Sequence, residues 1–510
     1  MNVAIIDIGS NNIKLEVHDI DERGNSNLLH EEKVPARLGH EVFITQKLAE
    51  PNKQAAIEGL LRLKKISEEH NCDEIIALGT AALREANEID FIDQVSKETG
   101  IKIEIISGVE EARLVYSGVL AHTPFNNKTF FLNDIGGGST EVSIANGKQI
   151  FNIESLRLGT VRLKEMFSTE EFGGASVKMM ESYVKRVFSP FKGAIGEHSA
   201  AMGLSTGGTA RNLAEMIKSA YGTVKEDHGL PLVQVADLRK LVEKIKEADT
   251  KELEKMKGLD PARVDIILPG AIILLAIYEA LEIQSFLVSP YGLRDGALVD
   301  YIFNKVNPRI YEERQNQYRY SSIEKISAKF NLNENHARQT ARIAGMIFET
   351  VASSLHIPLE YKEILEAAAM LHDTGKFIDY SQHHKHSFYL IMNSALLGFS
   401  ESEKMMIALT ARYHRKSAPK SSHLEFQALE KSEQEKVLKM AAMLRIADSL
   451  DRSSGVNIEN VQLKSASDDQ ITLSIIGTND VSLEQWSLER QSGFFEKAIK
   501  RTIRLEAVPA

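Results

Sequence analysis

The stretch Phe131-Leu132-Asn133-Asp134-Ile135-Gly136-Gly137-Gly138-Ser139-Thr140 is an apolar strand that ends in Asp-Ile-Gly and a turn of small residues. A near copy, Ala4-Ile5-Ile6-Asp7-Ile8-Gly9-Ser10-Asn11-Asn12, stands close to the start of the chain. A second apolar strand follows each turn, over 13–17 and 141–144. Because glycine has no Cβ, such a turn lets backbone N–H groups approach a phosphate closely. The two copies predict two similar halves that face one another across a cleft, with an aspartate at each edge.

Length and composition place the chain among multidomain globular proteins. It has 510 residues, which is too long for a single domain, and a formal net charge of −10, which argues against a non-specific nucleic-acid binder. The single cysteine, Cys72, excludes a disulfide framework and fits a reducing compartment. The longest apolar run, 266–277, contains Pro269 and Gly270 and is too short to span a bilayer. No secretion signal precedes the first strand, so we expect a cytoplasmic protein without a membrane span.

Periodicity divides the chain into four regions. Strand and helix signals alternate over 1–125, and the same theme repeats over 126–305, where the last long helix is expected at 260–281. Amphipathic helices dominate 315–455 and begin at 321. Residues 456–510 return to strands and one helix, 483–499, which predicts a small α/β cap. We therefore expect an α/β fold with two related domains, then an all-α domain and the cap.

Three further motifs stand where a strand gives way to a turn or a helix, and such junctions gather at the cleft of α/β folds. Gly79-Thr80-Ala81-Ala82-Leu83-Arg84 ends in an arginine, which can donate to two phosphate oxygens at once. A helix begins at Ser107-Gly108-Val109-Glu110-Glu111 with two carboxylates in its first turn. These carboxylates either take part in catalysis or stabilise the helix through its dipole. Ser205-Thr206-Gly207-Gly208-Thr209 is another turn of small residues. The combination of these three motifs with the two Asp-Ile-Gly turns favours one phosphate site over five unrelated features.

These groups suit hydrolysis of a phosphoanhydride, which needs neutralised phosphate charge, an oriented water and a metal ion. Asp7, Asp134 and Glu141 are hard oxygen ligands of the kind that Mg²⁺ takes. Glu111 is a candidate base to orient and activate water. The chain has no Gly-Lys-Ser/Thr signature, so it is not a P-loop enzyme.

Five linked motifs over residues 1–305 resemble the exopolyphosphatase and guanosine pentaphosphate phosphohydrolase (Ppx/GppA) family. They are Asp7–Asn11, Gly79–Arg84, Ile106–Arg113, Asp134–Glu141 and the late Gly292-Leu293-Arg294-Asp295-Gly296. The resemblance implies two actin/Hsp70/sugar-kinase-like (ribonuclease H-like) domains around a cleft. It implies an enzyme that releases orthophosphate from the end of inorganic polyphosphate with Mg²⁺ or Mn²⁺. By the family pattern, Glu111 is the catalytic carboxylate, Asp134 and Glu141 position metal and water, and Arg84 clamps phosphate. The expected phosphate contacts are Asp7, Ser10, Asn11, Gly136, Gly137, Gly138, Ser139, Gly207, Gly208 and Thr209.

Histidines gather in the helical region, where eight of the chain's 15 lie between His336 and His423. Imidazoles and carboxylates that converge from several helices make a metal site. The ordered set His336, His372-Asp373 and Asp448 resembles the HD metal-dependent phosphohydrolase superfamily, which implies an HD-like domain with a second divalent metal. His386 and His414 could add ligands. The competing interpretation is a vestigial site that lines a basic channel for a polyanion and forms a dimer contact.

The leading hypothesis is therefore an exopolyphosphatase, with inorganic polyphosphate as its partner. The alternative is a phosphohydrolase that removes the 5′ terminal phosphate of guanosine pentaphosphate (pppGpp), because both reactions use the same groups. A sensor that binds polyphosphate or guanosine penta- and tetraphosphate without turnover is disfavoured by Glu111, Asp134 and Glu141. A sugar kinase of the same fold lacks a recognisable sugar signature here. We also expect a homodimer, no specific nucleic acid, and domains at 1–125, 126–305, 315–455 and 456–510.

Overall fold

The computed structural model describes residues 1–123, 128–167, 174–195, 202–416, 418–420, 422–452, 458–467 and 469–509. The chain divides into two compact units, Met1–Arg314 and Gln315–Ala510. The boundaries expected at 125/126 and 455/456 fall outside the described residues, and the four-domain division stays a prediction.

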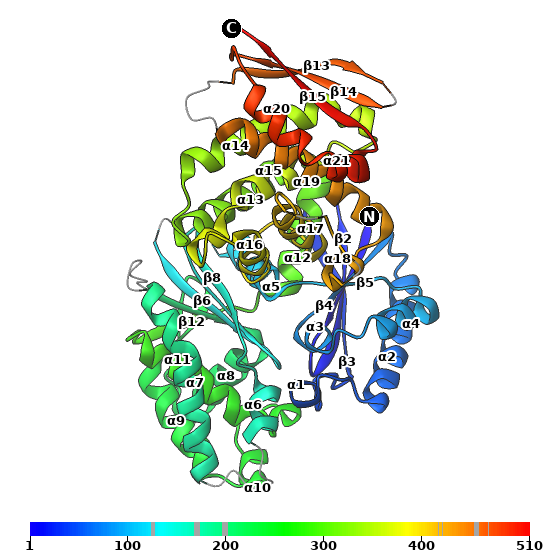
Figure 1. Cartoon of the computed structure of the whole chain (residues 1–510). Coiled ribbons are helices and arrows are strands. Elements are labelled where there is room, and N and C mark those ends of the chain that lie inside the picture. The colour runs from blue at the N-terminus through cyan, green and yellow to red at the C-terminus, as the bar shows by residue number, and fades with distance from the viewer. Residues whose placement is uncertain are drawn as a thin grey trace. The chain divides into compact units, whose positions relative to one another are not determined.

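The first sheet of the N-terminal unit has the strand order β3-β2-β1-β4-β5 (Figure 1). β1, β2 and β3 form an antiparallel meander, whereas β4 and β5 run parallel to β1. The hydrophobic core contacts one face through alternate residues of β2, such as Ile13, Leu15 and Val17. The strand bounds are β1 Asn2–Ile8, β2 Asn12–Ile20, β3 Ser26–Pro35, β4 Glu74–Gly79 and β5 Ile103–Ile105.

The second sheet has seven strands in the order β10-β11-β12-β9-β6-β7-β8. Its stretch β8-β7-β6-β9-β12 repeats the first sheet, with three antiparallel strands followed by two parallel ones. The shared order confirms the duplication predicted from the two Asp-Ile-Gly stretches. The strand bounds are β6 Phe130–Ile135, β7 Thr140–Ala145, β8 Ile150–Leu156, β9 Met202–Thr206, β10 Lys225–Asp227, β11 Leu230–Gln234 and β12 Ser285–Val288.

The helices of this unit follow the alternation expected from the sequence, with one corrected boundary. The helix predicted at 260–281 begins only at Ile267, because Asp260 caps a short 3-10 turn, Pro261–Arg263, instead. The α-helices are α1 Val42–Thr45, α2 Glu50–Glu69, α3 Ala81–Ala86, α4 Ile89–Thr99, α5 Gly108–His122, α6 Thr160–Phe167, α7 Gly174–Ile195, α8 Gly207–Tyr221, α9 Val235–Glu247, α10 Thr250–Glu254, α11 Ile267–Ala280 and α12 Leu293–Val306.

Helix α5 is held against α12 at very short range. A Cβ added to Gly296 would lie 1.9 Å from the carbonyl oxygen of Leu114, and one added to Gly118 would lie 2.4 Å from that of Gly292. Only glycine allows two backbones to approach so closely. The buried Arg113 also donates to Glu110 at 2.7 Å and forms an ion pair with Asp300 of α12. Glu110 is thus a structural partner of Arg113, and the first turn of α5 is fixed in place.

The C-terminal unit is a helical assembly with a three-stranded sheet. The largest difference from the prediction is at α13, which contains the boundary between the two units and begins at Pro308 rather than at 321, since residues 308–320 have few apolar side chains and these form no stripe. Its α-helices are α13 Pro308–Lys329, α14 Glu334–Val351, α15 Tyr361–Leu371, α16 His383–Met392, α17 Glu401–Arg412, α18 Leu424–Gln427, α19 Lys431–Arg452, α20 Ser482–Glu489 and α21 Ser492–Ile499, with 3-10 turns Ser353–Leu355 and Thr374–Phe377.

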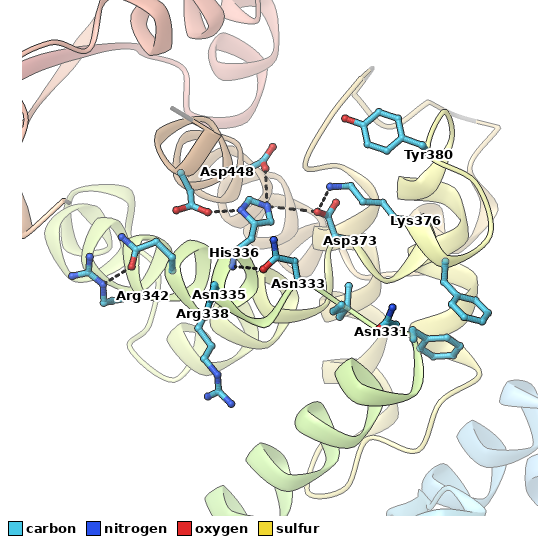
Figure 2. A pocket seen from close by; sticks show the side chains of 15 residues that line it. Asn331, Asn333, Asn335, His336, Arg338, Arg342, Asp373, Lys376, Tyr380 and Asp448 are labelled. Atoms are coloured by element: carbon cyan, nitrogen blue, oxygen red, sulfur yellow. Dashed lines mark hydrogen bonds and ion pairs between the residues drawn. The ribbon is translucent and has the colours of Figure 1, made fainter. Parts of the chain in front are cut away.

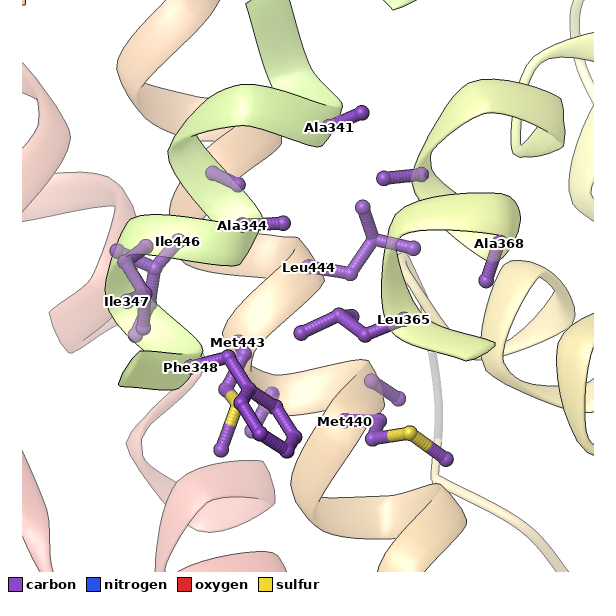
Figure 3. Packing of buried hydrophobic residues seen from close by; sticks show 14 of the residues in the cluster. Ala341, Ala344, Ile347, Phe348, Leu365, Ala368, Met440, Met443, Leu444 and Ile446 are labelled. Carbon is purple, nitrogen blue, oxygen red and sulfur yellow. The ribbon is translucent and has the colours of Figure 1, made fainter. Parts of the chain in front are cut away.

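The helices and the sheet of this unit share one hydrophobic cluster. Figure 3 shows its centre, where Phe348 of α14, Leu365 of α15 and Leu444 of α19 pack together. The strands β13 Asn460–Ala466, β14 Gln470–Ile476 and β15 Thr502–Val508 add their apolar faces to the same cluster. The single helix expected at 483–499 is instead two, α20 and α21, and Gln491 at the break accepts a hydrogen bond from the buried Arg445 at 2.7 Å. Among the described residues, no helix is long and apolar enough to cross a bilayer.

Candidate functional site

The two Asp-Ile-Gly turns close in the same way. In the first, the N–H of Gly9 donates to the carbonyl oxygen of Asn12 at 3.1 Å, and in the second the N–H of Gly136 donates to that of Ser139 at 3.0 Å. Each turn joins an antiparallel pair of strands, β1–β2 and β6–β7. The sequence repeat is therefore a repeat of geometry.

The residue opposite each aspartate distinguishes the two copies. Asp7 pairs across the ladder with Lys14, whose Nζ lies 3.5 Å from the aspartate Oδ2. Asp134 pairs with Glu141, so two acids stand opposite one another in the second copy. Like charges in this position repel and destabilise the pair. The first copy thus carries its own counter-charge, whereas the second favours a bound cation.

The two turns contribute to one cavity of about 140 Å³ in the N-terminal unit. Twelve of the fourteen residues predicted for catalysis or phosphate binding line it: Asp7, Ser10, Asn11, Glu111, Asp134, Gly136, Gly137, Gly138, Ser139, Gly207, Gly208 and Thr209. Arg84 and Glu141 are not among the lining residues. The motifs quoted from five separate parts of the chain therefore meet at one place.

Arg84 and Glu141 contact the groups around the cavity. Nη1 of Arg84 donates to the carboxylate of Glu111 at 3.2 Å and to the carbonyl oxygen of Ile106 at 2.8 Å. Glu141 accepts a hydrogen bond from Ser155 Oγ at 2.7 Å. In this structure the arginine expected to clamp phosphate is the ion-pair partner of the expected catalytic carboxylate.

The carboxylates of the cavity hold their protons more tightly than ordinary side chains do. Burial and the charge of Glu141 raise the pKa of Glu111 well above its usual range, although Arg84 opposes the shift. Burial, with Asp7 adding to it, raises the pKa of Asp134 to about 6 against the pull of Lys14. Burial also raises the pKa of Glu141. Burial is thus the main cause of the raised pKa values of these carboxyl groups, and neighbouring carboxylates add to it.

Two glycines at the start of α8 make room for this arrangement. Gly207 has a φ of +83°, and a Cβ on it would lie 2.2 Å from Oδ1 of Asp134. A Cβ on Gly208 would lie 1.6 Å from a guanidinium nitrogen of Arg263. The glycines are required both for the backbone conformation and for the approach of a carboxylate and a cation to the helix N-terminus.

Four cations that the sequence interpretation did not select also line the cavity: Lys14, Arg211, Arg263 and Arg294. Burial lowers the pKa of Arg263, and Arg211 beside it acts in the same direction, as expected where positive charge is concentrated. Lys14 and Arg211 could have been found, because each lies within a few residues of a predicted turn. Arg263 follows no such turn, and only the tertiary structure brings it to the cavity.

The C-terminal unit holds a second cluster. It contains two groups of potential metal ligands, His336–His372–Asp373 and Asp373–His383–His414. Within each group the ligand atoms lie within 4.8 Å of one another. Asp448 Oδ1 lies 3.6 Å from Nε2 of both His336 and His372, so all four residues of the predicted set come together. Figure 2 shows His336 between the carboxylates of Asp373 and Asp448.

Two further expectations for this cluster have different outcomes. His414, predicted as an additional ligand, belongs to the second group, whereas His386 belongs to neither. His383 takes the place of His386, because α16 begins at His383 and turns that side chain inward. Burial and the nearby His372 lower the pKa of His414 well below its usual value. Burial alone would raise the pKa of Asp448, but the imidazoles of His336 and His372 hold it well below its usual range.

Comparison with known proteins agrees with the fold. The model of the Ppx/GppA phosphatase family matches residues 17–304, and that of Ppx/GppA phosphatase, domain III, matches 318–495. Guanosine-5′-triphosphate,3′-diphosphate pyrophosphatases of Vibrio campbellii and Vibrio parahaemolyticus are 28% and 29% identical over 476 residues, which cover 92% of this chain and 91% of each relative.

Solved structures match mainly the N-terminal part. An exopolyphosphatase from Cytophaga hutchinsonii is 26% identical with a TM-score of 0.55 and covers 59% of this chain and 98% of its own. A Ppx/GppA family member from Aquifex aeolicus is 27% identical with a TM-score of 0.51 and covers 60% and 98%. The fold of residues 1–305 is thus the actin-like fold of this family, with mixed α/β sheets. The chain belongs to the Ppx/GppA phosphatase family and is a hydrolase of phosphoanhydride bonds.

Proposed function

We propose that the N-terminal cavity removes the terminal phosphate of inorganic polyphosphate in a Mg²⁺-dependent reaction. The observation that carries this proposal is the pairing of four cations with a cluster of buried acids in one cavity of about 140 Å³. The cations suit a run of phosphates, and the acids suit a metal ion and a base. None of the described residues that line the cavity is aromatic, and its size suits phosphate groups rather than a nucleoside.

The donor set fits Mg²⁺. Asp134 and Glu141 lie opposite one another in the β6–β7 pair, where neither faces a cation. Glu111 is a third carboxylate, and burial together with the charges of the other two raises its pKa. Mg²⁺ binds through one or two carboxylates and keeps several waters. When bound, it would offset charge on the phosphate oxygens and lower the barrier to attack. We propose Asp134 as its direct ligand and Glu141 as a second carboxylate that positions the metal ion and a water.

The remaining roles fall to the protein's own side chains. Glu111, whose pKa is raised, is suited to accept a proton from the attacking water near neutral pH. Arg84 fixes the orientation of Glu111 through their 3.2 Å contact. Backbone N–H groups of the two turns and of the start of α8 bind phosphate oxygens. Water adds to the terminal phosphorus, the bridging P–O bond breaks, and the products are orthophosphate and a shortened chain.

A second candidate substrate is guanosine 5′-triphosphate 3′-diphosphate. Relatives named for that pyrophosphatase reaction align over 92% of this chain, including the C-terminal unit. The bond broken has the same chemistry, so the same residues would act. The guanosine would lie outside the cavity, whose volume of about 140 Å³ suits phosphate groups and whose described lining has no aromatic ring to stack on a base.

Rates of phosphate release from the two candidate substrates distinguish the two proposed functions. We expect faster phosphate release from long polyphosphate than from short polyphosphate or from guanosine 5′-triphosphate 3′-diphosphate, with Mg²⁺ and with Mn²⁺. Initial rates should be compared at equal concentrations of chain ends in a malachite-green assay. A higher kcat/KM for the guanosine substrate would support the second function. If neither substrate released phosphate, the hypothesis of a non-catalytic sensor would be the one that remains.

Removal of the metal ion should reveal the raised pKa values. Asp134 holds its proton up to about pH 6 when folded but loses it near pH 4 when unfolded, so its contribution to stability falls as pH rises through this window. Mg²⁺ competes with that proton. We therefore expect Mg²⁺ to raise the melting temperature of EDTA-treated protein more at pH 8 than at pH 5. Asp134→Asn should remove most of this difference; an equal Mg²⁺ effect at both pH values in the unchanged protein would contradict the assignment.

We also propose that the helices of 315–455 form an HD-like domain. The support is that His336, His372, Asp373 and Asp448, predicted from sequence order alone, come within ion-pair distance. The homodimer and the cytoplasmic location stay predictions, and light scattering of the purified protein would measure the first.

A further inference from the structure

The start of helix α6 is hydrogen-bonded to all three glycines of the second Asp-Ile-Gly turn. The N–H of Thr160 donates to the carbonyl oxygen of Gly136 at 3.0 Å, and the N–H of Val161 donates to that of the next glycine at 2.9 Å. The side chain of Arg162 completes the set, because its Nε donates to the carbonyl oxygen of Gly138 at 2.7 Å. Each of the three carbonyl oxygens is therefore directed toward α6.

These hydrogen bonds fix the direction of the N–H groups of the turn. In a trans peptide the C=O and the N–H that follows it point in opposite directions, and the turn contains no cis peptide bond. Because the carbonyl oxygens face α6, the N–H groups of Gly137, Gly138 and Ser139 point away from it. All three residues line the cavity, and within the described residues none of these N–H groups has an acceptor. Successive N–H groups of this kind form a concave site for an anion.

The turn is packed on both sides. A Cβ on Gly159, just before α6, would lie 2.3 Å from the carbonyl oxygen of Gly137, so a larger residue would push the segment and the turn apart. The other side meets the first-sheet half of the N-terminal unit, residues 1–105. A Cβ on Gly138 would lie 2.4 Å from the ring of Phe43, and one on Gly137 would lie 2.8 Å from Cβ of Ser10. The turn is thus held between α6 and the first-sheet half.

Arg162 connects the turn with the first-sheet half. It is buried at 5% exposure, its Nη2 donates to Glu85 of α3 at 3.0 Å, and its guanidinium lies 4.3 Å from the ring centroid of Phe43 of α1. Helix α6 lies beside α1 in this unit (Figure 1). A buried guanidinium keeps its place only where such partners surround it. The hydrogen bond to Gly138 therefore depends on a carboxylate 77 positions away in the chain.

Contacts of α6 with the first-sheet half do not all involve the turn. Glu165, further along the same helix, accepts a hydrogen bond from the N–H of Glu41 at 2.6 Å. Arg162 differs, because one side chain contacts both the turn and the first-sheet half. A planar guanidinium can hold a carbonyl oxygen and a carboxylate in fixed directions at once, which a single ammonium nitrogen does far less well. An arginine at 162 thus suits a group that sets the orientation of the turn.

We propose that Arg162 is a positioning residue of the N-terminal site: it directs the N–H groups of the Gly136–Ser139 turn toward the terminal phosphate of the substrate, while Glu85 and Phe43 hold its guanidinium in place. The inference rests on the proposed function, in which this turn binds phosphate. Arg162 is not among the residues that line the cavity, so it acts through the turn. Phosphate affinity then depends on the contact between the turn and the first-sheet half.

Equilibrium binding tests the orientation of the turn. Arg162→Met, which keeps a long side chain and removes its donors, is made in full-length Glu111→Gln protein, so that labelled polyphosphate is bound but not consumed. We expect Kd to rise about 10- to 100-fold, the loss that follows when a charge-assisted hydrogen bond to phosphate is broken. Lys164→Met is the matched control on the same helix: it loses an ion pair with Asp265, and its Kd should stay within about two-fold. Equal Kd values for the two variants would overturn the proposal.

Phosphate release with Glu111 intact separates positioning from general damage to the site. In Arg162→Met we expect KM for polyphosphate to rise about 10-fold or more, in line with the weaker binding. The Mg²⁺ concentration for half-maximal rate should stay that of the unchanged protein, because the hydrogen bonds of Arg162 reach the turn and Glu85 but not Asp134. A shift in Mg²⁺ dependence together with a lower melting temperature would assign Arg162 a structural role and refute the proposal.

Glu85→Gln tests the connection to the first-sheet half. It keeps the volume of the side chain and the hydrogen bond from Arg162 to Gly138 but removes the charge that holds the guanidinium. Kd for polyphosphate should rise about 3- to 10-fold, and an unchanged Kd would refute the connection. If Arg162→Met does not fold, Arg162→Lys replaces it, with a higher Kd expected, because one ammonium cannot reproduce both directed contacts.

The unchanged protein distinguishes a failure of this inference from a failure of the proposed function. If it releases phosphate from neither polyphosphate nor guanosine 5′-triphosphate 3′-diphosphate, the proposed function fails and this inference fails with it. If it releases phosphate and the folded Arg162 variants match it in Kd and KM, the inference alone is wrong.

Discussion

Glu111→Gln is expected to lower phosphate release by about 10³-fold while substrate binding stays near that of the unchanged protein. A general base contributes roughly 10²- to 10⁴-fold, and an amide of the same shape cannot accept the proton from water. Glu111 lines the cavity at 8% exposure, and its pKa is raised well above its usual range, as a base that works near neutral pH requires. Initial rates give kcat, and equilibrium binding of labelled polyphosphate gives Kd. Glu111→Ala should have the same effect on turnover.

Stability distinguishes this catalytic role from a structural one. Glu111, Glu141 and Asp134 repel one another, so a neutral side chain at 111 should leave the melting temperature unchanged or raise it. Glu104→Gln is the matched control, because it makes the same change on an exposed strand residue outside the cavity. Turnover within a few-fold of the unchanged protein would refute the assignment of Glu111. A lower melting temperature would assign it a structural role instead.

Gly207→Ala is expected to lower phosphate release by about 100-fold or more and to raise the Mg²⁺ concentration needed for half-maximal rate. The added Cβ would lie 2.2 Å from Oδ1 of Asp134, so the carboxylate must move by about 1 Å, a displacement that costs roughly 10²-fold in catalysis. Gly207 also has a φ of +83°, where alanine is strained by about 1–2 kcal/mol. Rates across a Mg²⁺ titration separate the two effects, because strain alone does not alter the metal dependence.

Gly222 provides the control for this prediction. It ends the same helix that Gly207 begins, has a φ of +64°, and has no atom within 4 Å of an added Cβ. Gly222→Ala should therefore lose stability to a similar degree and keep its activity and its Mg²⁺ dependence. If Gly207→Ala and Gly222→Ala behave alike in both assays, the contact with Asp134 has no part in catalysis.

The repeat shows how much of the fold can be predicted from sequence. A strand, a turn of small residues and a second strand are local features, so both hairpins and the equivalent order of the two sheets follow from two short stretches. The start of α13 could not be predicted in this way. Its first turns have few apolar side chains, and these form no apolar stripe that would mark a helix. The break between α20 and α21 was not predicted either, and the contact found there, from Arg445 to Gln491, joins residues 46 positions apart in the chain.

The positions of histidine and arginine side chains at the two sites also could not be predicted from the sequence. His386 and His383 share a helix, and spacing alone does not show which of them turns toward Asp373. Arg84 was expected to face phosphate, but its nearest acid in space is Glu111, which is 27 positions away in the chain. Arg263 reaches the cavity only because Gly208 leaves room for its guanidinium.

The sequence by itself determined the family, the duplicated hairpins and twelve of the residues that line the cavity, because these rest on residue types at short and fixed spacings. The tertiary structure alone decided how charge is distributed: Lys14 beside Asp7, Glu141 opposite Asp134, Arg84 on Glu111, and four imidazoles around Asp373. The reason is physical. Electrostatic interactions depend on distance and burial, and both are set by contacts between residues far apart in the chain.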